Sequence, residues 1–209
     1  MRHIAGREDI RDLILDAVDV LLARFGYKKM TMEDVARQVG IGKGTIYVHF
    51  PGKEELILSH IDRIAGRVAS KLRNIAASSA SHSARIREML SARVLIRFDS
   101  VSHYSQSLSD LLASVRTAFL ARRQGYFRIE ENIFEDVLRE GVKAGTLDCP
   151  DPRSASRVLV QCTNSLLPYS LSARELGERE NVAADAGRIA DFLIKGLAPC
   201  PKRSFRSKR

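Results

Sequence analysis

The chain has 209 residues, of which 44% are hydrophobic, so it can bury a sizeable core in one domain or two small ones. This composition excludes disordered and fibrous proteins, and no apolar run approaches the roughly 20 residues of a membrane span. The net charge is +9, and segment 199–209 holds five basic residues and no acidic one. We expect that segment to be a disordered tail, which either adds unspecific affinity for nucleic acid or only aids solubility. Residues 1–9 lack the apolar core of a signal peptide, so we expect a cytoplasmic protein.

The first predicted helix covers residues 8–25, where apolar residues recur with a period of 3.6 and Gly26 follows as a stop signal. Its opposite face would repel phosphate groups, because it is acidic. The acidic residues are Asp9, Asp12, Asp16 and Asp19. We therefore expect this helix to pack behind the segment that follows, with its acidic face turned away from any nucleic acid.

Residues 31–50 are predicted to form two short helices joined by a glycine turn, which is a helix-turn-helix. Thr31 is a natural N-cap for the first of them, and Asp34 completes a capping box. Gly40 is placed to end that helix in the left-handed conformation. Gly42 then allows a second change of direction. The first helix has one apolar face: Met32, Val35, Ala36 and Val39.

The second short helix is anchored by Ile46 and Phe50, which lie four residues apart on one face. The other positions carry donors for phosphates and base edges: Lys43, Thr45, Tyr47 and His49. Gly44 lets the helix backbone approach a sugar-phosphate strand, and Lys53 lies in the first turn of the next helix. This pattern favours DNA binding, and the alternative is a helical hairpin with a solvated polar face.

The run MTMEDVARQVGIGKGTIYVHFPGKEEL, residues 30–56, resembles the signature of the TetR family of bacterial transcription regulators. The resemblance is strong over residues 8–68 and rests on helical architecture alone beyond them. It implies a homodimer whose second short helix enters the major groove of double-stranded DNA. It also implies phosphate contacts by Tyr47, His49 and Lys53, with Lys43, Gly44 and Thr45 nearer the bases.

Two positions depart from that family pattern. Gly42 stands where many members have a serine N-cap, which removes a hydroxyl group that would reach a phosphate. Val48 replaces a commoner polar or aromatic residue, so any contact there would be apolar, as with a thymine methyl group. The predicted DNA-binding residues are Thr31, Lys43, Gly44, Thr45, Tyr47, Val48, His49 and Lys53.

The rest of the chain is helical by pattern, and neither alternating strands nor repeats occur. The pattern predicts an all-α protein of about nine helices, with a three-helix helix-turn-helix domain at residues 1–52. A larger helical domain for effector binding and dimerisation follows at 53–198, and the basic tail at 199–209. The later helices are expected at about 54–77, 85–101, 108–112, 115–142, 152–170 and 181–197.

The last two predicted helices each carry an apolar stripe of small and branched residues, which suits close packing of helices. The TetR resemblance implies that they form a four-helix bundle with a second copy, and the alternative is burial in the core of the monomer. A dimer also doubles the length of DNA that is recognised. The predicted interface residues are Val158, Cys162, Leu166, Tyr169, Ile189 and Leu193.

Charged residues lie where the larger domain calls for apolar ones. Arg93 and Arg97 fall in the middle of an apolar stripe, and Glu130 lies near the centre of another, with Arg123 and Tyr126 on the same helix. An unpaired buried charge costs several kcal/mol. These residues therefore either form an interior Arg–Glu link, or Glu130 leaves part of the arginine charge free to bind an anionic or carboxylate-bearing effector.

Nothing in the sequence indicates an enzyme, a cofactor or a metal. Catalytic and dinucleotide-binding signatures are absent, and the five histidines do not cluster. The cysteines Cys149, Cys162 and Cys200 have no histidine companions at metal-ligand spacing. The expected protein is a homodimeric, ligand-responsive repressor that binds a palindromic operator and a small-molecule effector. The alternative is a helical adaptor that binds protein and not specific DNA.

Overall fold

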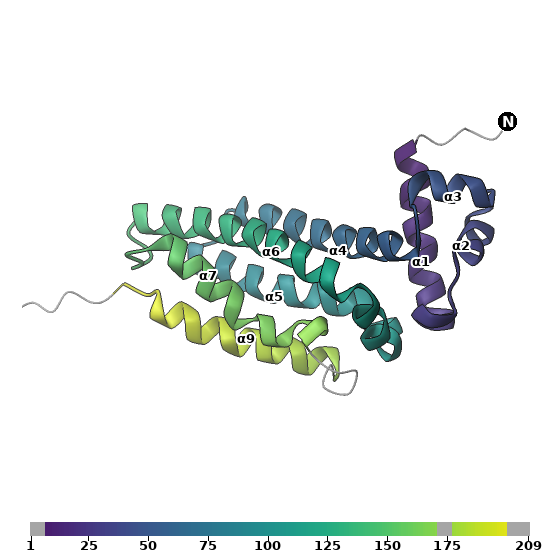
Figure 1. Cartoon of the computed structure of the whole chain (residues 1–209). Helices are drawn as coiled ribbons and strands as arrows, with labels where there is room; N and C mark the ends of the chain where they lie inside the picture. The colour runs from purple at the N-terminus through teal and green to yellow at the C-terminus, as the bar shows by residue number, and fades with distance from the viewer. Residues whose placement is uncertain (1–6, 171–176, 200–209) are drawn as a thin grey trace, which may run out of the picture.

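The computed structural model describes residues 7–170 and 177–199, and these residues are helical with no strand among them. The expected all-α class is therefore confirmed, and Figure 1 shows a small head of short helices at one end of a longer helical body. No helix in the described ranges is long and apolar enough to cross a membrane. The helices are α1 (Arg7–Lys29), α2 (Met32–Val39), α3 (Lys43–His49), α4 (Lys53–Ala76), α5 (His82–Val101), α6 (Ser105–Lys143), α7 (Pro152–Cys162) and α9 (Arg179–Gly196).

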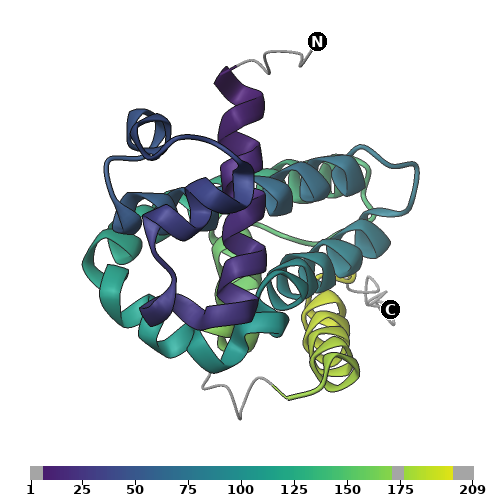
Figure 2. The same cartoon turned by 90° about the vertical axis from the view of Figure 1, so that its right-hand side faces the viewer.

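The head consists of α1, α2 and α3, and α4 leads from it into the body. Figure 2, seen from the head end, shows α1 crossing in front of the body helices. The acidic face of α1 meets α4, where Arg63 binds Asp16 at 2.7 Å and Asp19 at 3.1 Å. The helix contains Gly26 at φ 69°, a left-handed conformation that breaks it where the sequence predicted its end.

In the body, α5 packs against α4 on one side and α9 on the other, while α7 packs on α6. One apolar cluster runs from the head into the near end of the body and includes Val18 of α1, Ile46 of α3, Ile57 of α4 and Leu111 of α6. The predicted boundary between residues 52 and 53 therefore crosses a shared core. The division into two domains stays a prediction, and the predicted tail lies outside the described residues from residue 200 onward.

Two predicted helix boundaries are wrong. The segments expected at 108–112 and 115–142 form one helix, α6, because no proline or glycine separates them. The helix expected at 152–170 ends at Cys162, where the Thr163 side chain bonds back to the carbonyl of Val160 at 3.3 Å. The chain then continues through two short 3-10 helices, η2 (Asn164–Leu166) and η3 (Pro168–Ser170), and another, η1 (Ser102–Tyr104), joins α5 to α6.

Candidate nucleic-acid interface and internal cavity

The turn between α2 and α3 is built from local hydrogen bonds and one left-handed glycine. The Thr31 hydroxyl accepts from the backbone N–H of Asp34, the Asp34 carboxylate accepts from the backbone N–H of Thr31, and both contacts are 3.1 Å long. Gly40 ends α2 at φ 76° and ψ 33°, as expected. Gly42 is the N-cap of α3 at φ −69°, a value that any residue adopts, so the turn does not require glycine there.

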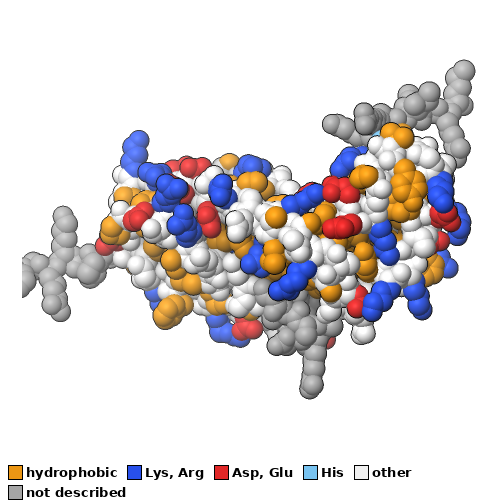
Figure 3. Space-filling model, viewed as in Figure 1, with side chains coloured by type: hydrophobic (Ala, Val, Ile, Leu, Met, Phe, Trp, Pro, Cys, Tyr) orange, Lys and Arg blue, Asp and Glu red, His pale blue; other side chains and the backbone are white. Residues whose placement is uncertain are grey.

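Helix α3 is buried on one side and exposed to solvent on the other. Ile46 and Phe50 are fully buried, whereas Tyr47 is 44% exposed and Val48 is 68% exposed. Lys43 and Gly44 are also exposed, and Thr45 and His49 are half-buried. Figure 3 shows Lys and Arg side chains spread over the head, around this helix. Lys43, Tyr47 and Val48, three of the residues expected to contact DNA, are therefore exposed on a helix that Ile46 and Phe50 anchor.

The two predicted lysine contacts are engaged within the protein. Lys43 forms an ion pair with Glu33 of α2. The Lys53 ammonium group donates to the Tyr27 carbonyl and lies 4.1 Å from the centroid of the Tyr27 ring, and burial lowers the pKa of Lys53. An ammonium group has three N–H donors, so Lys53 retains two for a phosphate. To contact DNA, Lys43 would have to break its ion pair with the Glu33 carboxylate.

Arg11 of α1 also supports α3, although no pattern in the sequence indicated this role. Its guanidinium group donates to the His49 carbonyl and the Ser59 hydroxyl, at 3.1 Å each, and lies 4.4 Å from the centroid of the Phe50 ring. A cation at the carbonyl end of a helix is favourable because it meets the negative end of the helix dipole. Arg11 thus holds the end of α3 against α1 and α4.

Within the body, the Arg–Glu link expected from the sequence is present. Arg93 donates to Glu130 at 2.7 Å, and Arg97 binds the other oxygen of the same carboxylate. All three side chains are buried. Burial alone would raise the pKa of Glu130, but the two guanidinium groups outweigh it and lower that pKa. The remaining donors of Arg93 bind the Val160 carbonyl, Thr163 and Asn164, so this arginine joins α5 to the end of α7.

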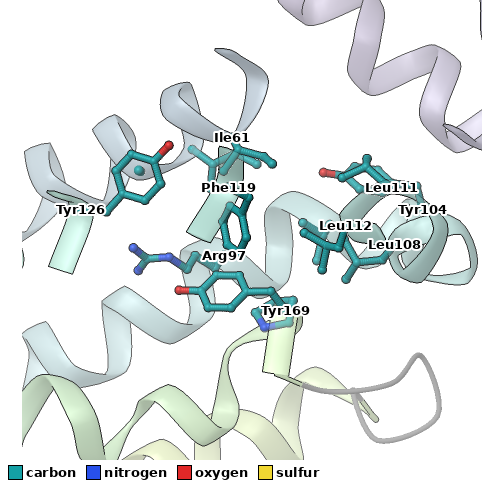
Figure 4. A pocket seen from close by; sticks show the side chains of 13 residues that line it. Ile61, Arg97, Tyr104, Leu108, Leu111, Leu112, Phe119, Tyr126 and Tyr169 are labelled. Atoms are coloured by element: carbon teal, nitrogen blue, oxygen red, sulfur yellow. The ribbon is translucent and has the colours of Figure 1, made fainter. Parts of the chain in front are cut away.

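A small cavity of about 40 Å³ lies next to this link, between α4, α5, α6 and η3, and it opens to the surface. Figure 4 shows Arg97, Tyr104, Tyr126 and Tyr169 around it. Apolar side chains provide most of the lining, among them Ile61, Ile64, Val101, Leu108, Leu112 and Phe119.

Only part of the predicted effector site faces this cavity. Arg97 and Tyr126 line it, whereas Arg93 and Glu130 do not, because they are turned toward each other and toward α7. Arg123 is also absent from the lining, since its guanidinium group lies over the rings of Phe127 and Tyr169, at 5.4 and 5.9 Å from their centroids. Of the residues predicted for the effector site, Arg93, Arg123 and Glu130 therefore do not line this cavity.

A buried polar contact connects the cavity with the head. Tyr104 lines the cavity, and its hydroxyl group lies 3.0 Å from Nε2 of His60 on α4. The same Nε2 is 3.4 Å from the Asp19 carboxylate of α1, while Nδ1 of His60 has no hydrogen-bond partner among the described residues. Burial, together with Arg63 and Arg67, lowers the pKa of His60 to about 3, so the imidazole is neutral.

The residues predicted for the dimer interface do not share one environment. Val158 is 47% exposed and Cys162 is exposed. Leu166, Ile189 and Leu193 are half-buried, and Leu166 and Leu193 pack against the core of their own protomer.

Tyr169 does not belong to that interface set. It packs edge-on against Phe119 inside the cavity, with 5.2 Å between ring centroids, so its assignment to the dimer surface is wrong. Phe192 on α9 is 78% exposed and was missed, although a bulky aromatic residue outside the predicted stripe was a signal.

A helix-turn-helix head, with its second helix open to solvent and a larger helical body behind it, defines a DNA-binding transcriptional regulator. Residues 14–59 match the family model described as bacterial regulatory proteins of the tetR family. Over these residues the chain is similar to the TetR family of transcriptional regulators.

Three comparisons extend over most of the chain. The uncharacterized HTH-type transcriptional regulator YhgD of Bacillus subtilis is 23% identical over 91% of this chain and 97% of its own length. The HTH-type transcriptional repressor KstR2 of Rhodococcus jostii is 26% identical over 68% of this chain and 70% of its own. The crystal structure of FadR from Bacillus subtilis in complex with stearoyl-CoA has a TM-score of 0.64 at 18% identity. It covers 89% of this chain and 98% of its own, and it establishes the shared fold.

Proposed function

We propose that this protein is a ligand-responsive repressor that binds a palindromic operator as a homodimer and acts by binding alone, without catalysis. The observation that carries the proposal is the anchored helix α3, which presents Tyr47 and Val48 to solvent while Ile46 and Phe50 are fully buried. A short helix held in this way enters a major groove without first having to be ordered. The similarity to the repressor KstR2 supports repression of transcription as the mode of control.

The proposed docking divides the outer face of the head into two kinds of contact. Tyr47, His49 and Lys53 contact phosphates, which fix the position of the head on the duplex. Lys43, Gly44 and Thr45 lie at the N-terminal end of α3, which approaches base edges in this class of motif. Val48 meets an apolar group such as a thymine methyl. Thr31 supports the arrangement as the N-cap of α2.

The proposed dimer surface is the outer side of α7 and α9. Val158 and Phe192 expose large apolar side chains there, and an exposed apolar patch often marks a protein interface. Two copies joined at this surface would present two heads to the two halves of a palindrome. The four-helix bundle implied by the family resemblance is consistent with this choice.

The proposed effector is a small molecule that binds in the cavity, and an anionic one is the alternative that the sequence left open beside a purely structural Arg–Glu link. Helix α4 lines the cavity through Ile61 and Ile64, and it begins only four residues after the end of α3. Arg122 of α6 also holds α4 to the body, through Glu55 at 2.8 Å and Asp62 at 2.6 Å. A ligand that binds one position of α4 more tightly would shift the heads and so change operator affinity. FadR, whose fold is shared, was crystallised with stearoyl-CoA.

Selection of bound fragments from genomic DNA, followed by a salt titration on the selected operator, tests the DNA-binding part. Tyr47→Phe and Lys53→Ala are expected to weaken binding to all sequences, and the salt slope should fall by about one in Lys53→Ala, which removes a cation, and stay unchanged in Tyr47→Phe, which removes none. Thr45→Ala, the matched change near the bases, should alter sequence preference instead. If no fragment is enriched, or if the phosphate variants bind as tightly as the parent at every salt concentration, the proposed docking is wrong and a helical adaptor becomes the better account.

Light scattering tests the dimer. Phe192→Glu should give a folded monomer, because this side chain is largely exposed within one protomer. Leu13→Glu is the matched control, since Leu13 is also exposed but lies on α1 in the head. A monomeric parent at micromolar concentration would remove the dimer from the proposal.

A further inference from the structure

The buried link between α5 and α6 has an excess of positive charge. It contains two guanidinium groups, Arg93 and Arg97, and one carboxylate, Glu130. Within residues 7–170 and 177–199, Glu130 is the carboxylate that lies within ion-pair distance of either arginine. The group therefore carries one uncompensated positive charge in a place with almost no solvent, where such a charge is costly.

Arg97 keeps more unused N–H donors than Arg93. Arg93 binds Glu130, the Val160 carbonyl, Thr163 and Asn164, and it does not line the cavity. Among the described residues, Arg97 has two hydrogen-bond partners, Glu130 and the Arg93 carbonyl, the latter at 2.8 Å, although a guanidinium group has five N–H donors. Arg97 also lines the cavity.

One polar group beside Arg97 is placed to support a bound anion, because the Tyr126 hydroxyl already donates to Asp62 while that of Tyr169 lies beside the arginine. The side chains of Tyr126 and Tyr169 line the same cavity, and Figure 4 shows the Tyr169 hydroxyl on the same side as the Arg97 guanidinium group. The rest of the wall is apolar, through residues such as Ile61, Leu112 and Phe119. A cation and a phenol at one end of an apolar cavity match a ligand that has a charged head and an apolar body.

We infer that the effector of the proposed function is an amphiphilic carboxylate, bound with its carboxylate at Arg97 and its apolar body along α4 and α6. The carboxylate balances the uncompensated charge, so the buried link and the ligand together contain two arginines and two carboxylates. A neutral ligand of the same shape leaves the charge unbalanced, and a cationic ligand adds to it. Charge selection by Arg97 is therefore the specific property of this cavity.

The test uses the full-length protein and three ten-carbon probes: decanoate, 1-decanol and decylamine. Calorimetry without DNA should show decanoate binding at least tenfold more tightly than 1-decanol, and no binding of decylamine. Arg97→Met should reduce the preference for decanoate to less than twofold. This variant is expected to fold, because Arg93 and Glu130 remain as a balanced pair. Arg97→Lys keeps the charge and should keep the preference, which gives a second measurement if the methionine variant does not fold.

Equal binding of decanoate and 1-decanol to the parent, or no binding of decanoate, would overturn the inference, as would a full decanoate preference in Arg97→Met. Operator affinity is measured separately, so that a failure of the ligand inference can be told apart from a failure of the proposed response to the ligand. If decanoate binds at Arg97 but leaves operator affinity unchanged, the ligand inference stands and the proposed response fails. If another molecule releases the operator while decanoate does not bind, the response stands and the carboxylate inference fails.

Discussion

The head and the body of this protein place their charged residues in opposite ways. In the head, Lys43 lies on α3 and forms an ion pair with Glu33, and both side chains are exposed. In the body, Arg93, Arg97 and Glu130 are buried together and join helices distant in the chain. Exposed pairs contribute little to stability and are easily exchanged, whereas a buried set is costly to break. The difference indicates that the head is built for reversible contact and the body for holding one arrangement.

The largest expected effect comes from breaking the buried link. Glu130→Gln leaves two buried arginines without a carboxylate and should lower the free energy of unfolding by about 3–5 kcal/mol. Urea denaturation measures this change. Asp191→Asn is the control, because it removes a carboxylate from an exposed pair with Arg87, and it should leave stability close to that of the parent. Equal effects of the two substitutions would contradict the proposed contrast between buried and exposed ion pairs.

A slightly smaller loss of stability is expected on acidification, at the buried contact of His60 with Tyr104 and Asp19. His60 has a pKa of about 3 in the folded protein, against an ordinary value of 6.5, so on acidification the unfolded chain takes up a proton that the folded chain does not. The stabilisation is fully present above pH 6.5 and is lost as the pH falls from 6.5 toward 3, at about 1.4 kcal/mol per pH unit. About 3 kcal/mol should be lost by pH ~4.5.

The matched variant for this pH effect is His60→Leu combined with Tyr104→Phe, which removes both partners of the hydrogen bond. Urea denaturation from pH ~7 to ~4.5 should show a shallower loss of stability in the double variant than in the parent. If stability falls equally with pH in the parent and the double variant, His60 is protonated in the folded state and does not account for the loss of stability in acid.

Within the head, an intermediate effect is expected from Arg11→Ala. The change removes the contacts of Arg11 with His49 and Phe50 and should cost about 1 kcal/mol, since a cation over an aromatic ring is worth roughly 0.5–1 kcal/mol at an exposed site. Operator affinity should also fall, because α3 loses its support. Arg24→Ala serves as the control, since Arg24 stacks on Phe25 and not on α3. Unchanged operator affinity in Arg11→Ala would show that α3 is fixed by Ile46 and Phe50 alone.

The smallest expected effect compares the two turn glycines. A Cβ atom at Gly42 would lie 3.8 Å from Thr45, an ordinary contact, and serine there would supply the missing N-cap of α3. Gly42→Ser should therefore raise stability by a few tenths of a kcal/mol. Gly40→Ser should lower stability by about 1 kcal/mol, because Gly40 is left-handed. Thermal denaturation of both variants measures the difference, and a loss of stability in Gly42→Ser would show that this position needs glycine after all.

Much of the head was predictable from the sequence, because its elements are set by short-range interactions. The capping box of Thr31 and Asp34, the left-handed Gly40 and the anchors Ile46 and Phe50 all depend on residues close together in the chain. The helical character of the body follows in the same way from its apolar periodicity. The presence of an Arg–Glu link was also predictable as one of two alternatives, because charges in an apolar stripe need partners.

Only the tertiary structure decided which side chains meet across the body. Arg93 faces α7 while Arg97, four residues later, lines the cavity, and that difference depends on where α6 and α7 cross α5. Tyr169 lies in the cavity because α7 ends early at Thr163 and η3 turns inward. Arg11 reaches His49 across 38 positions in the chain, a contact that no local pattern encodes. Periodicity shows which face of a helix is buried, but the partner on that face is fixed by long-range packing.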